Sequence, residues 1–337
     1  MKALVMRAAG DIRLESVPEP SLKPGEALLR VRRVGLCGSD LNSYRGRNPL
    51  VTYPRIPGHE IAATIVELSV PHSDFTPGMD VTLSPYSECG DCPACTNDRP
   101  NACRRNQTLG VQRDGALAEY ISVPVARLYR PNLDLEALCL VEPLTVGAHA
   151  VARANVTVRD TVAIFGCGGV GIGAVAASAF RGAVTVAIDV DDAKLALARE
   201  AGASHTIHSQ REALAPALAA ITRDSGPAVV IEAVGTPDTF RAAVELVSFT
   251  GRVVYIGYAK EPVCYETRLF VQKELDIRGA RNAMPEDFHQ VIDMLEHKRF
   301  PVASAIDKVA PLDEAPQIFH AWSEHPSQFK KIMVTLD

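Results

Sequence analysis

The sequence predicts a two-domain chain of the α/β and β class, in which a β-barrel-like domain precedes a doubly wound parallel sheet. Two observations support this fold: short alternating apolar runs recur before residue 145, and strands alternate with helices after it. The length of 337 residues also favours two hydrophobic cores over one. We place a first domain at 1–145, a second at 146–285, and at 286–337 a C-terminal segment that packs back on the first.

The first domain is predicted to be rich in β-structure. Turn signals containing Pro-Gly lie at 23–26 and 76–80 and separate runs of alternating hydrophobicity. The expected strands lie at 27–31, 62–67 and 118–123. This pattern is typical of a small barrel with long loops that carry function.

The pattern changes near residue 144, where a helix is expected at 144–154. Six strands with intervening helices then match a doubly wound parallel sheet. These strands are expected at 162–165, 184–188, 205–207, 229–233, 253–256 and 275–278. After the sheet, the chain is expected to form helices at 286–297 and 313–322 and a final strand at 331–336.

Composition limits the classes of function. A hydrophobic fraction of 47% and a charged fraction of 22% are ordinary for a soluble globular protein. The net charge of -5 argues against a general nucleic-acid binder. No apolar run reaches the roughly 18 residues of a membrane span, and residues 1–5 open directly into a strand-like pattern without signal-peptide features. We therefore expect a cytoplasmic protein with no membrane or nucleic-acid partner.

A glycine-rich loop after the first strand of the second domain predicts a dinucleotide site. The loop follows an apolar strand at 161–165 and opens an alanine-rich helix, which is the context that the motif requires. The expected binding residues are Gly166, Gly168, Gly169, Val170 and Gly171. In this arrangement the first glycine permits a tight turn, the second admits the pyrophosphate, and the last allows close helix packing.

Asp189 favours NAD over NADP. It closes the next strand, eighteen residues after Gly171, where a carboxylate can accept hydrogen bonds from the adenosine ribose and repel a 2′-phosphate. No arginine follows it directly. The alternative is a flavin or another nucleotide on the same fold, but nothing else in the chain indicates a flavin enzyme.

Four cysteines within fifteen residues predict a structural metal site. Such clustering in a large chain favours metal over disulfides. Four sulfur ligands leave no position for water, which is typical of structural zinc. The four are Cys89, Cys92, Cys95 and Cys103. Reduced surface thiols are the alternative, and a nucleic-acid zinc module is disfavoured because the lobe lacks a continuous basic stripe.

A second group of residues has the mixed ligands of catalytic zinc. Cys37 and His59 are expected ligands, and Glu60 and Glu142 are candidates for the third. Three protein ligands leave the fourth position to water or substrate. Because adjacent side chains diverge in an extended strand, Glu60 needs a local bend to join His59. We expect Glu142 or water to alternate with Glu60.

These motifs together resemble those of the zinc-containing medium-chain alcohol dehydrogenases, over the whole chain. The resemblance implies a GroES-like β-barrel catalytic domain and a Rossmann domain. The Glu-Pro-Leu sequence at 142–144 resembles the polyol, threonine and sugar-acid branch more than the ethanol enzymes. The stretch 278–282, followed by a helix, looks most like bacterial 5-dehydrogenases of hexonates such as L-gulonate, L-galactonate or L-idonate.

The resemblance implies an enzyme that oxidises a secondary alcohol, with two zinc ions and NAD. Ser39 is expected to accept the alcohol proton, Glu60 to act at the zinc, and Asp40 to orient the His59 ring or to fix its loop. Similar enzymes often have a histidine where this chain has Asn42. Because Asn does not titrate, the proton relay must end elsewhere, at water or at the cofactor ribose.

The substrate is predicted less sharply than the chemistry. A carboxylate substrate favours a guanidinium, for which Arg281 and Arg45 are candidates, while Tyr44 and Asn282 are candidates for binding hydroxyls. The alternative is that Arg45 is simply solvated and that Arg281 caps a structural turn. Other hypotheses are a polyol or L-threonine dehydrogenase and a catalytically silent NAD-sensing regulator. Similar enzymes are oligomeric, so a homotetramer or homodimer is expected.

Overall fold

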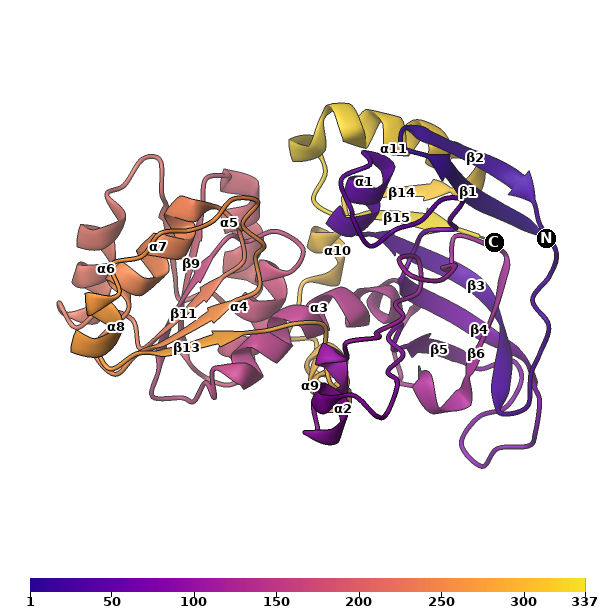
Figure 1. Cartoon of the computed structure of the whole chain (residues 1–337), viewed down its shortest axis with the longest axis horizontal. Coiled ribbons are helices and arrows are strands. Elements are labelled where there is room, and N and C mark those ends of the chain that lie inside the picture. The colour runs from indigo at the N-terminus through magenta and orange to yellow at the C-terminus, as the bar shows by residue number, and fades with distance from the viewer. Residues whose placement is uncertain (337) are drawn as a thin grey trace. The chain divides into compact units, whose positions relative to one another are not determined.

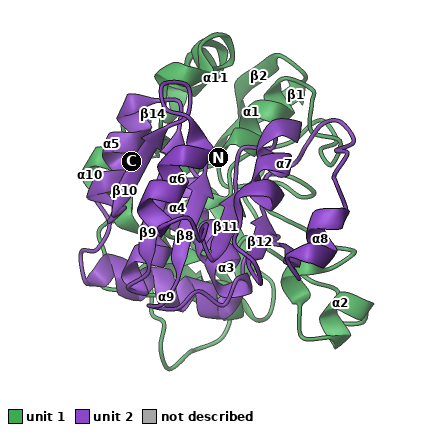
Figure 2. Cartoon of the chain, turned by 90° about the vertical axis from the view of Figure 1, so that its left-hand side faces the viewer, with its two compact units in different colours: residues 1–142, 302–337 green, residues 143–301 purple. Residues whose placement is uncertain are grey.

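A computed structural model describes residues 1–336, and residue 337, the last of the predicted C-terminal segment, lies outside the described residues. The chain forms two compact units (Figures 1 and 2). Unit 1 comprises residues 1–142 together with the chain from Val302 onward, and unit 2 comprises Pro143–Pro301. The C-terminal strand and helix therefore belong to the same unit as the N-terminus.

Unit 1 is built on a seven-stranded sheet and a separate two-stranded hairpin. The hairpin consists of β1 (Lys2–Ala8) and β2 (Asp11–Ser16). The sheet runs in the order β14 (Lys308–Pro311), β15 (Ile332–Thr335), β3 (Glu26–Leu36), β4 (Glu60–Leu68), β5 (Asp80–Leu83) and β7 (Leu128–Tyr129), with β6 (Tyr120–Pro124) paired to β3. The β-rich first domain expected from the alternating runs is confirmed.

Short helices complete unit 1. They are α1 (Gly38–Tyr44), α2 (Pro93–Thr96), α10 (Val302–Ala305) and α11 (Ala315–Glu324). Phe319 and Trp322 of α11 are buried in the same apolar cluster as Leu29 of β3 and Ile61 of β4. Burial of large apolar side chains is the main stabilising contribution here, at about 1.5–3 kcal/mol for each. The cluster attaches the C-terminal helix to the barrel.

Unit 2 contains a six-stranded parallel sheet. The strands, in spatial order, are β10 (His205–His208), β9 (Val184–Asp189), β8 (Thr161–Phe165), β11 (Val229–Glu232), β12 (Arg252–Tyr255) and β13 (Asp276–Gly279). All six predicted strands are present to within two residues. The order reverses between β8 and β11, so the carboxyl ends of these two strands mark the place where open α/β sheets bind ligands.

A helix follows each strand of unit 2. They are α4 (Gly171–Phe180), α5 (Asp192–Glu200), α6 (Leu214–Thr222), α7 (Pro237–Leu246), α8 (Arg268–Gln272) and α9 (Pro285–Glu296). The sequence analysis assigned α9 to the C-terminal segment from residue 286, but α9 lies in unit 2. Phe288 is fully buried, and Asp287 Oδ2 lies 2.7 Å from Nδ1 of His149 within this unit. These contacts, which have no local sequence signal, account for the difference.

Helix α3 (Leu135–Arg153) is longer than the predicted helix at 144–154 and contains Glu142 and Pro143. The division between the units falls between these two residues. Among the described helices, α3 is the one that is long and apolar enough to cross a membrane by length and composition, although no membrane span was expected. Because 78% of its apolar window is buried in the fold, we interpret α3 as a core helix.

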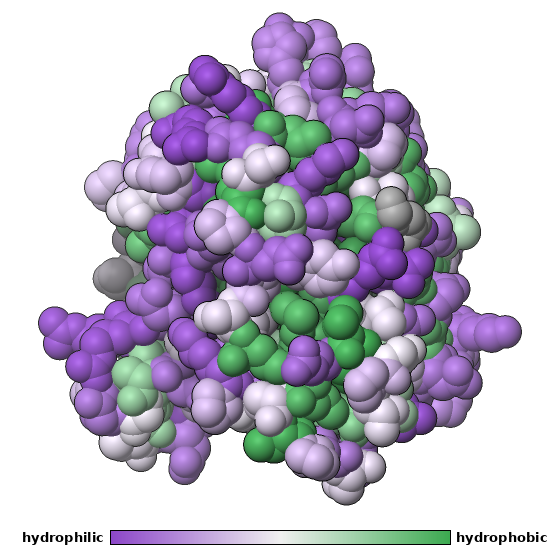
Figure 3. All heavy atoms as spheres, turned by 90° about the vertical axis from the view of Figure 1, so that its right-hand side faces the viewer, coloured by the Kyte–Doolittle hydropathy of each residue, from purple (hydrophilic) through white to green (hydrophobic). Residues whose placement is uncertain are grey.

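The face of unit 1 that carries the N-terminal hairpin is mostly polar (Figure 3). Figure 3 shows the side that carries the N-terminal hairpin, with hydrophilic side chains over most of the face and an apolar patch among them. Apolar groups of this kind are usual on folded proteins.

Candidate active site

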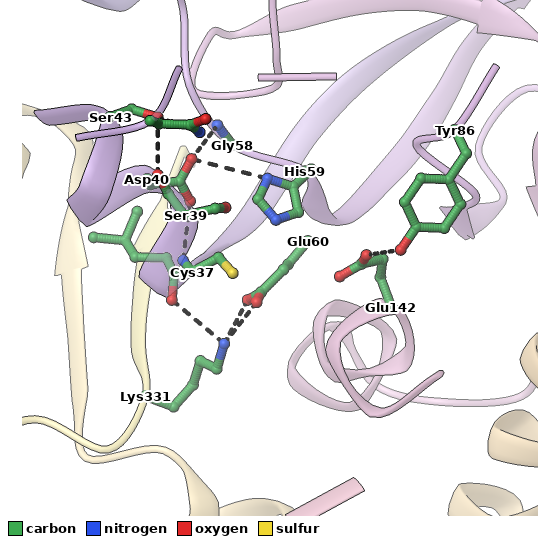
Figure 4. Close-up of polar contacts among 12 residues, drawn as sticks. Cys37, Ser39, Asp40, Ser43, Gly58, His59, Glu60, Tyr86, Glu142 and Lys331 are labelled. Carbon is green, nitrogen blue, oxygen red and sulfur yellow. Dashed lines mark hydrogen bonds and ion pairs between the residues drawn. The ribbon is translucent and has the colours of Figure 1, made fainter. Parts of the chain in front are cut away.

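Three of the proposed metal ligands converge in unit 1 (Figure 4). Cys37 follows β3 and caps α1, His59 precedes β4, and Glu60 is the first residue of β4. Because β3 and β4 pair antiparallel with Gly35 opposite Glu60, the end of one strand adjoins the beginning of the other. One ligand atom from each of the three side chains lies within 4.8 Å of the others. A sulfur, a ring nitrogen and a carboxylate at these separations fit one zinc ion.

Two glycines make room for this convergence. Gly58 has a φ of +100°, so the chain bends directly before His59. In a straight strand, the side chains of His59 and Glu60 would point to opposite faces. The bend at Gly58 lets both side chains reach the same site. A Cβ atom on Gly35 would lie 2.0 Å from Oε2 of Glu60. Any larger residue at position 35 would displace the Glu60 carboxylate.

Asp40 fixes the loops that carry two of the ligands. Its Oδ2 accepts the backbone N–H of Cys37 at 2.9 Å, and its Oδ1 accepts that of Gly58 at 3.3 Å. Oδ1 also lies 3.8 Å from Nδ1 of His59. This ring nitrogen has no hydrogen-bond partner among the described residues. Burial raises the pKa of Asp40, while the neighbouring His59 lowers it. The Asp40 carboxylate thus holds the backbone at Cys37 and at Gly58 through direct hydrogen bonds.

The electrostatics of the cluster favour a positive charge. Burial lowers the pKa of His59, but the Asp40 carboxylate and a hydrogen bond with Cys37 more than offset this, so the pKa lies well above its usual value. A buried site that favours an imidazolium in this way suits a cation. Together with the sulfur, nitrogen and oxygen donors, this property fits a bound zinc ion.

Glu60 has a partner that sequence reasoning missed. Nζ of Lys331 lies 2.7 Å from both carboxylate oxygens of Glu60 and 3.3 Å from the carbonyl oxygen of Leu36. Lysine and glutamate are 8% and 1% exposed. Burial lowers the pKa of Lys331, but the nearby Glu60 carboxylate raises it by more, so the lysine pKa lies above its usual value. A lysine beside a C-terminal strand carries no sequence signal for this role.

Glu142 lies beside the cluster but is not part of the three-residue group. It sits in α3 with 3% of its surface exposed. The hydroxyl of Tyr86, a second residue that the sequence analysis missed, donates to Oε1 of Glu142 (Figure 4). Burial raises the pKa of Glu142, His59 lowers it and Glu60 raises it. The two buried carboxylates therefore lie near each other with different direct partners, a lysine for Glu60 and a tyrosine for Glu142.

The other predicted residues of unit 1 have separate places. Ser39 is half-buried in α1 and Asn42 is exposed. The ring of Tyr44 packs on Phe319, with centroids 5.7 Å apart. Arg45 donates from Nε to the hydroxyl of Ser323 at 3.1 Å and from a second nitrogen to the Ser323 carbonyl. Tyr44 and Arg45 thus both contact α11, within unit 1.

The four cysteines of the predicted lobe come together. Their sulfurs are separated by 3.4 Å (Cys89–Cys103), 3.6 Å (Cys92–Cys95), 3.8 Å (Cys92–Cys103) and 4.0 Å (Cys89–Cys95). Four sulfurs bound tetrahedrally at about 2.3 Å from zinc would be about 3.8 Å apart. The backbone N–H of Arg105 donates to the Cys103 sulfur at 3.3 Å. The lobe therefore has the geometry of a closed zinc site.

The glycine-rich loop of unit 2 fits a dinucleotide. Gly166 has a φ of +89°, and a Cβ on Gly171 would lie 1.8 Å from the Gly166 carbonyl oxygen. A Cβ on Gly168 or Gly169 would meet nothing within 4 Å, so the backbone here is open to a ligand. Val170 forms the N-cap of α4. The helix N-terminus and the open backbone suit a pyrophosphate.

Asp189 holds the end of this loop. Its Oδ2 accepts the backbone N–H of Cys167 at 2.7 Å, and its Oδ1 accepts those of Val190 and Asp191 at 2.7 and 3.1 Å. These bonds fix a carboxylate at the carboxyl end of β9. A ribose hydroxyl can still donate to the remaining lone-pair site.

Glu232 is a third residue that the sequence analysis missed. It ends β11, is fully buried, and accepts through Oε1 from the backbone N–H groups of Val234 and Gly235 and from the hydroxyl of Thr239. Its Oε2 has no hydrogen-bond partner in the described part of the chain. Arg281 and Asn282 also lie in unit 2, between β13 and α9, both half-buried.

Comparisons with known proteins identify the family of the chain. The alcohol dehydrogenase GroES-like domain matches residues 23–132, and the zinc-binding dehydrogenase domain matches residues 169–297. A zinc-type alcohol dehydrogenase-like protein of Haemophilus influenzae is 33% identical over 98% of both chains. The chain belongs to the zinc-type medium-chain alcohol dehydrogenase family. It is thus an oxidoreductase that acts on CH–OH groups.

Further members of the family show the range of substrates and cofactors. The chain is 35% identical to L-galactonate-5-dehydrogenase of Escherichia coli (83% of this chain, 85% of that one) and 34% identical to sorbitol dehydrogenase of Bacillus subtilis (83% and 81%). Two solved dehydrogenases have TM-scores of 0.92 and cover 99–100% of this chain and 99% of their own. The one from Sinorhizobium meliloti is 29% identical and binds NADP, and RspB of Escherichia coli is 26% identical and binds NADH.

Proposed function

We propose that this dehydrogenase oxidises a secondary alcohol of a sugar acid to the ketone, with zinc at the site and NAD as hydride acceptor. The observation that supports this most strongly is the buried convergence of Cys37, His59 and Glu60 within 4.8 Å. Glu142 is the alternative third ligand. Cys37 and His59, with Glu60 or Glu142, would hold a zinc ion, which would supply Lewis-acid chemistry that makes a substrate hydroxyl more acidic.

Ser39 is proposed to accept the proton of the substrate hydroxyl, since it lies two residues from Cys37 at the start of α1. Asp40 holds the two ligand loops. Since Asn42 cannot titrate, the proton then passes to water or to the cofactor ribose. A second zinc is proposed in the four-cysteine lobe, where it replaces an apolar core.

NAD is proposed over NADP because of Asp189. Its carboxylate is held by three backbone N–H groups and would repel a 2′-phosphate. Residues 166–171 would bind the pyrophosphate, through Gly166, Gly168, Gly169, Val170 and Gly171. NADP is the alternative cofactor, because a similar solved dehydrogenase is bound to NADP. Activity with each cofactor distinguishes the two.

A hexonate such as L-gulonate, L-galactonate or L-idonate is the proposed substrate, supported by the identity with L-galactonate-5-dehydrogenase. Arg281 is the proposed carboxylate partner and Asn282 a hydroxyl partner, because Arg45 and Tyr44 already contact α11. The similarity to sorbitol dehydrogenase favours a polyol as the second candidate. L-threonine would need a partner for its ammonium group, for which no residue has been identified.

The test is NADH formation by the zinc-loaded protein with hexonates, pentitols, hexitols, L-threonine and short alcohols. We expect turnover of one hexonate epimer. Cys37→Ser should abolish this turnover, whereas Cys264→Ser, which alters an exposed thiol, should leave it unchanged. Loss of affinity in Arg281→Ala would support the carboxylate clamp. Turnover of neutral polyols alone would exclude it. No turnover, with two zinc ions and tight NAD binding, would contradict the substrate class and favour a silent regulator.

We also propose a cytoplasmic homotetramer or homodimer. β13 is an edge strand of the unit 2 sheet, and its Ile277 is 41% exposed. Such an edge can pair with a second copy. Light scattering of the purified protein measures the assembly, and a monomer at micromolar concentration would contradict it.

A further inference from the structure

Two buried carboxylates lie in and beside the cluster of proposed metal ligands, and their direct partners differ. Both oxygens of Glu60 contact the ammonium group of Lys331. Glu142 instead accepts a hydrogen bond at Oε1 from the neutral hydroxyl of Tyr86. In Figure 4 the other Glu142 oxygen lies on the side of Cys37, His59 and Glu60. The Tyr86 hydroxyl thus holds the edge of the carboxylate that faces away from the cluster.

The Tyr86–Glu142 contact is buried and joins distant segments. Tyr86 is 6% exposed and lies between β5 and the four-cysteine lobe, while Glu142 is 3% exposed and lies in α3. The residues are 56 positions apart. A buried carboxylate that loses a hydrogen-bond donor is destabilised by the full desolvation penalty. The buried Tyr86 contact therefore constrains Glu142 more than a hydrogen bond at the protein surface would.

We infer that Tyr86 is a positioning residue, whose hydroxyl orients Glu142 toward the zinc site. This inference rests on the proposed function, because it assigns Glu142 to that site. With Oε1 held, rotation of the Glu142 carboxylate is restricted and Oε2 is the oxygen presented to the metal or to its bound hydroxyl. Positioning groups of this kind tune a metal centre through its ligands.

The test is Tyr86→Phe, which removes one oxygen atom and keeps the ring. Cobalt in place of zinc gives a visible spectrum that reports ligand geometry and needs no substrate. We expect an altered cobalt spectrum, a fall in kcat of about 10- to 100-fold and an unchanged KM for NAD, as for a lost hydrogen bond to a charged group. In a Glu142→Ala background, Tyr86→Phe should cause no further change, because Tyr86 acts through Glu142.

Tyr53→Phe is the matched control. Its hydroxyl donates to the backbone carbonyl of Ser43 at 2.5 Å in the same unit, so this variant loses a hydrogen bond away from the cluster. We expect its cobalt spectrum and kcat to match those of the unaltered protein. If Tyr86→Phe does not fold, Glu142→Asp withdraws the carboxylate from the phenol and should alter the cobalt spectrum in the same way.

The outcomes separate this inference from the proposed function. An active enzyme whose cobalt spectrum is unchanged by Tyr86→Phe, with additive losses in the double variant, would overturn the positioning role alone. An altered spectrum in a protein that oxidises none of the tested alcohols would support the positioning role and overturn the proposed substrate. Cobalt bound only by the four cysteines would overturn both.

Discussion

Lys331 and Glu60 are 271 positions apart in the chain, yet Nζ of the lysine lies 2.7 Å from both carboxylate oxygens of the glutamate. The pair places a cation from the start of the C-terminal strand beside the proposed zinc ligands. Asp307 reinforces it by accepting the backbone N–H of Lys331 at 2.8 Å. The C-terminal part of unit 1 thus completes the site that the N-terminal part begins.

Lys331→Met should destabilise the protein strongly after metal is removed by a chelator. The substitution keeps the apolar stem but leaves Glu60 as an unpaired buried charge. Breaking a buried ion pair in this way typically costs about 3–5 kcal/mol. Urea denaturation measures the free energy of unfolding, and bound zinc should offset part of the loss.

Lys330→Met is the control for this prediction. Lys330 is exposed, and its Nζ donates to the Ser304 carbonyl. Its substitution should change the unfolding free energy by only about 0.5 kcal/mol. Equal effects of the two lysine variants would contradict the importance of the Glu60 pair, and recovery in Glu60→Gln/Lys331→Met would support it.

Cys103→Ser should reduce the zinc content from two ions per chain to one. Its sulfur lies 3.4 Å from that of Cys89 and 3.8 Å from that of Cys92, so its loss opens the closed site. Because the metal replaces an apolar core, the lobe at 89–103 should become sensitive to protease. Elemental analysis and limited proteolysis measure both effects.

Cys264→Ser, which alters an exposed thiol, should leave the zinc content and the protease pattern unchanged. If Cys103→Ser retained two ions and a protected lobe, the four cysteines would not be the second zinc site.

Asp189→Asn should relax the preference for NAD. The amide oxygen can still accept the backbone N–H of Cys167, although the NH2 group then faces the N–H groups of Val190 and Asp191. The neutral side chain no longer repels a 2′-phosphate. Since like charges in contact cost several kcal/mol, we expect the ratio of kcat/KM for NADP to that for NAD to rise about 10- to 100-fold. Asp192→Asn, at an exposed residue paired with Arg211, should leave the ratio unchanged. An equal loss with both cofactors would contradict the charge argument.

Glu232 should make the stability of the protein depend on pH. Burial raises its pKa, although the N–H of Gly235, the Thr239 hydroxyl and the N–H of Val234 act against this. The folded pKa therefore lies above the unfolded value of about 4.3. The group contributes most stability below the unfolded pKa, and this contribution is lost as pH rises through the folded pKa.

Glu232→Gln removes this titration. We expect the Tm of the unaltered protein, relative to that of the variant, to increase as pH is lowered from 8 to 5. Calorimetry of both proteins in the same buffers measures the difference, and effects of pH on zinc binding are common to both. A difference that is constant or decreases toward low pH would show that Glu232 is not held with a raised pKa.

The sequence determined the features that depend on local pattern. The strand–glycine loop–helix at 161–180, the six parallel strands and the β-rich first domain follow from periodicity and turn residues, which act over a few neighbouring positions. The spacing of Cys89, Cys92, Cys95 and Cys103 is equally local. Each of these predictions needed only residues that are close in the chain.

Only the tertiary structure decided the contacts between distant residues. Lys331 beside Glu60, Tyr86 beside Glu142 and His149 beside Asp287 each join segments that no periodicity relates. Burial makes these polar pairs necessary, because an unpaired charge or donor in the interior is costly, but it does not specify the partner. The partner is set by which strands and helices pack together. That is why the ligand types of this site could be predicted from the sequence, whereas the groups that hold the two carboxylates could not.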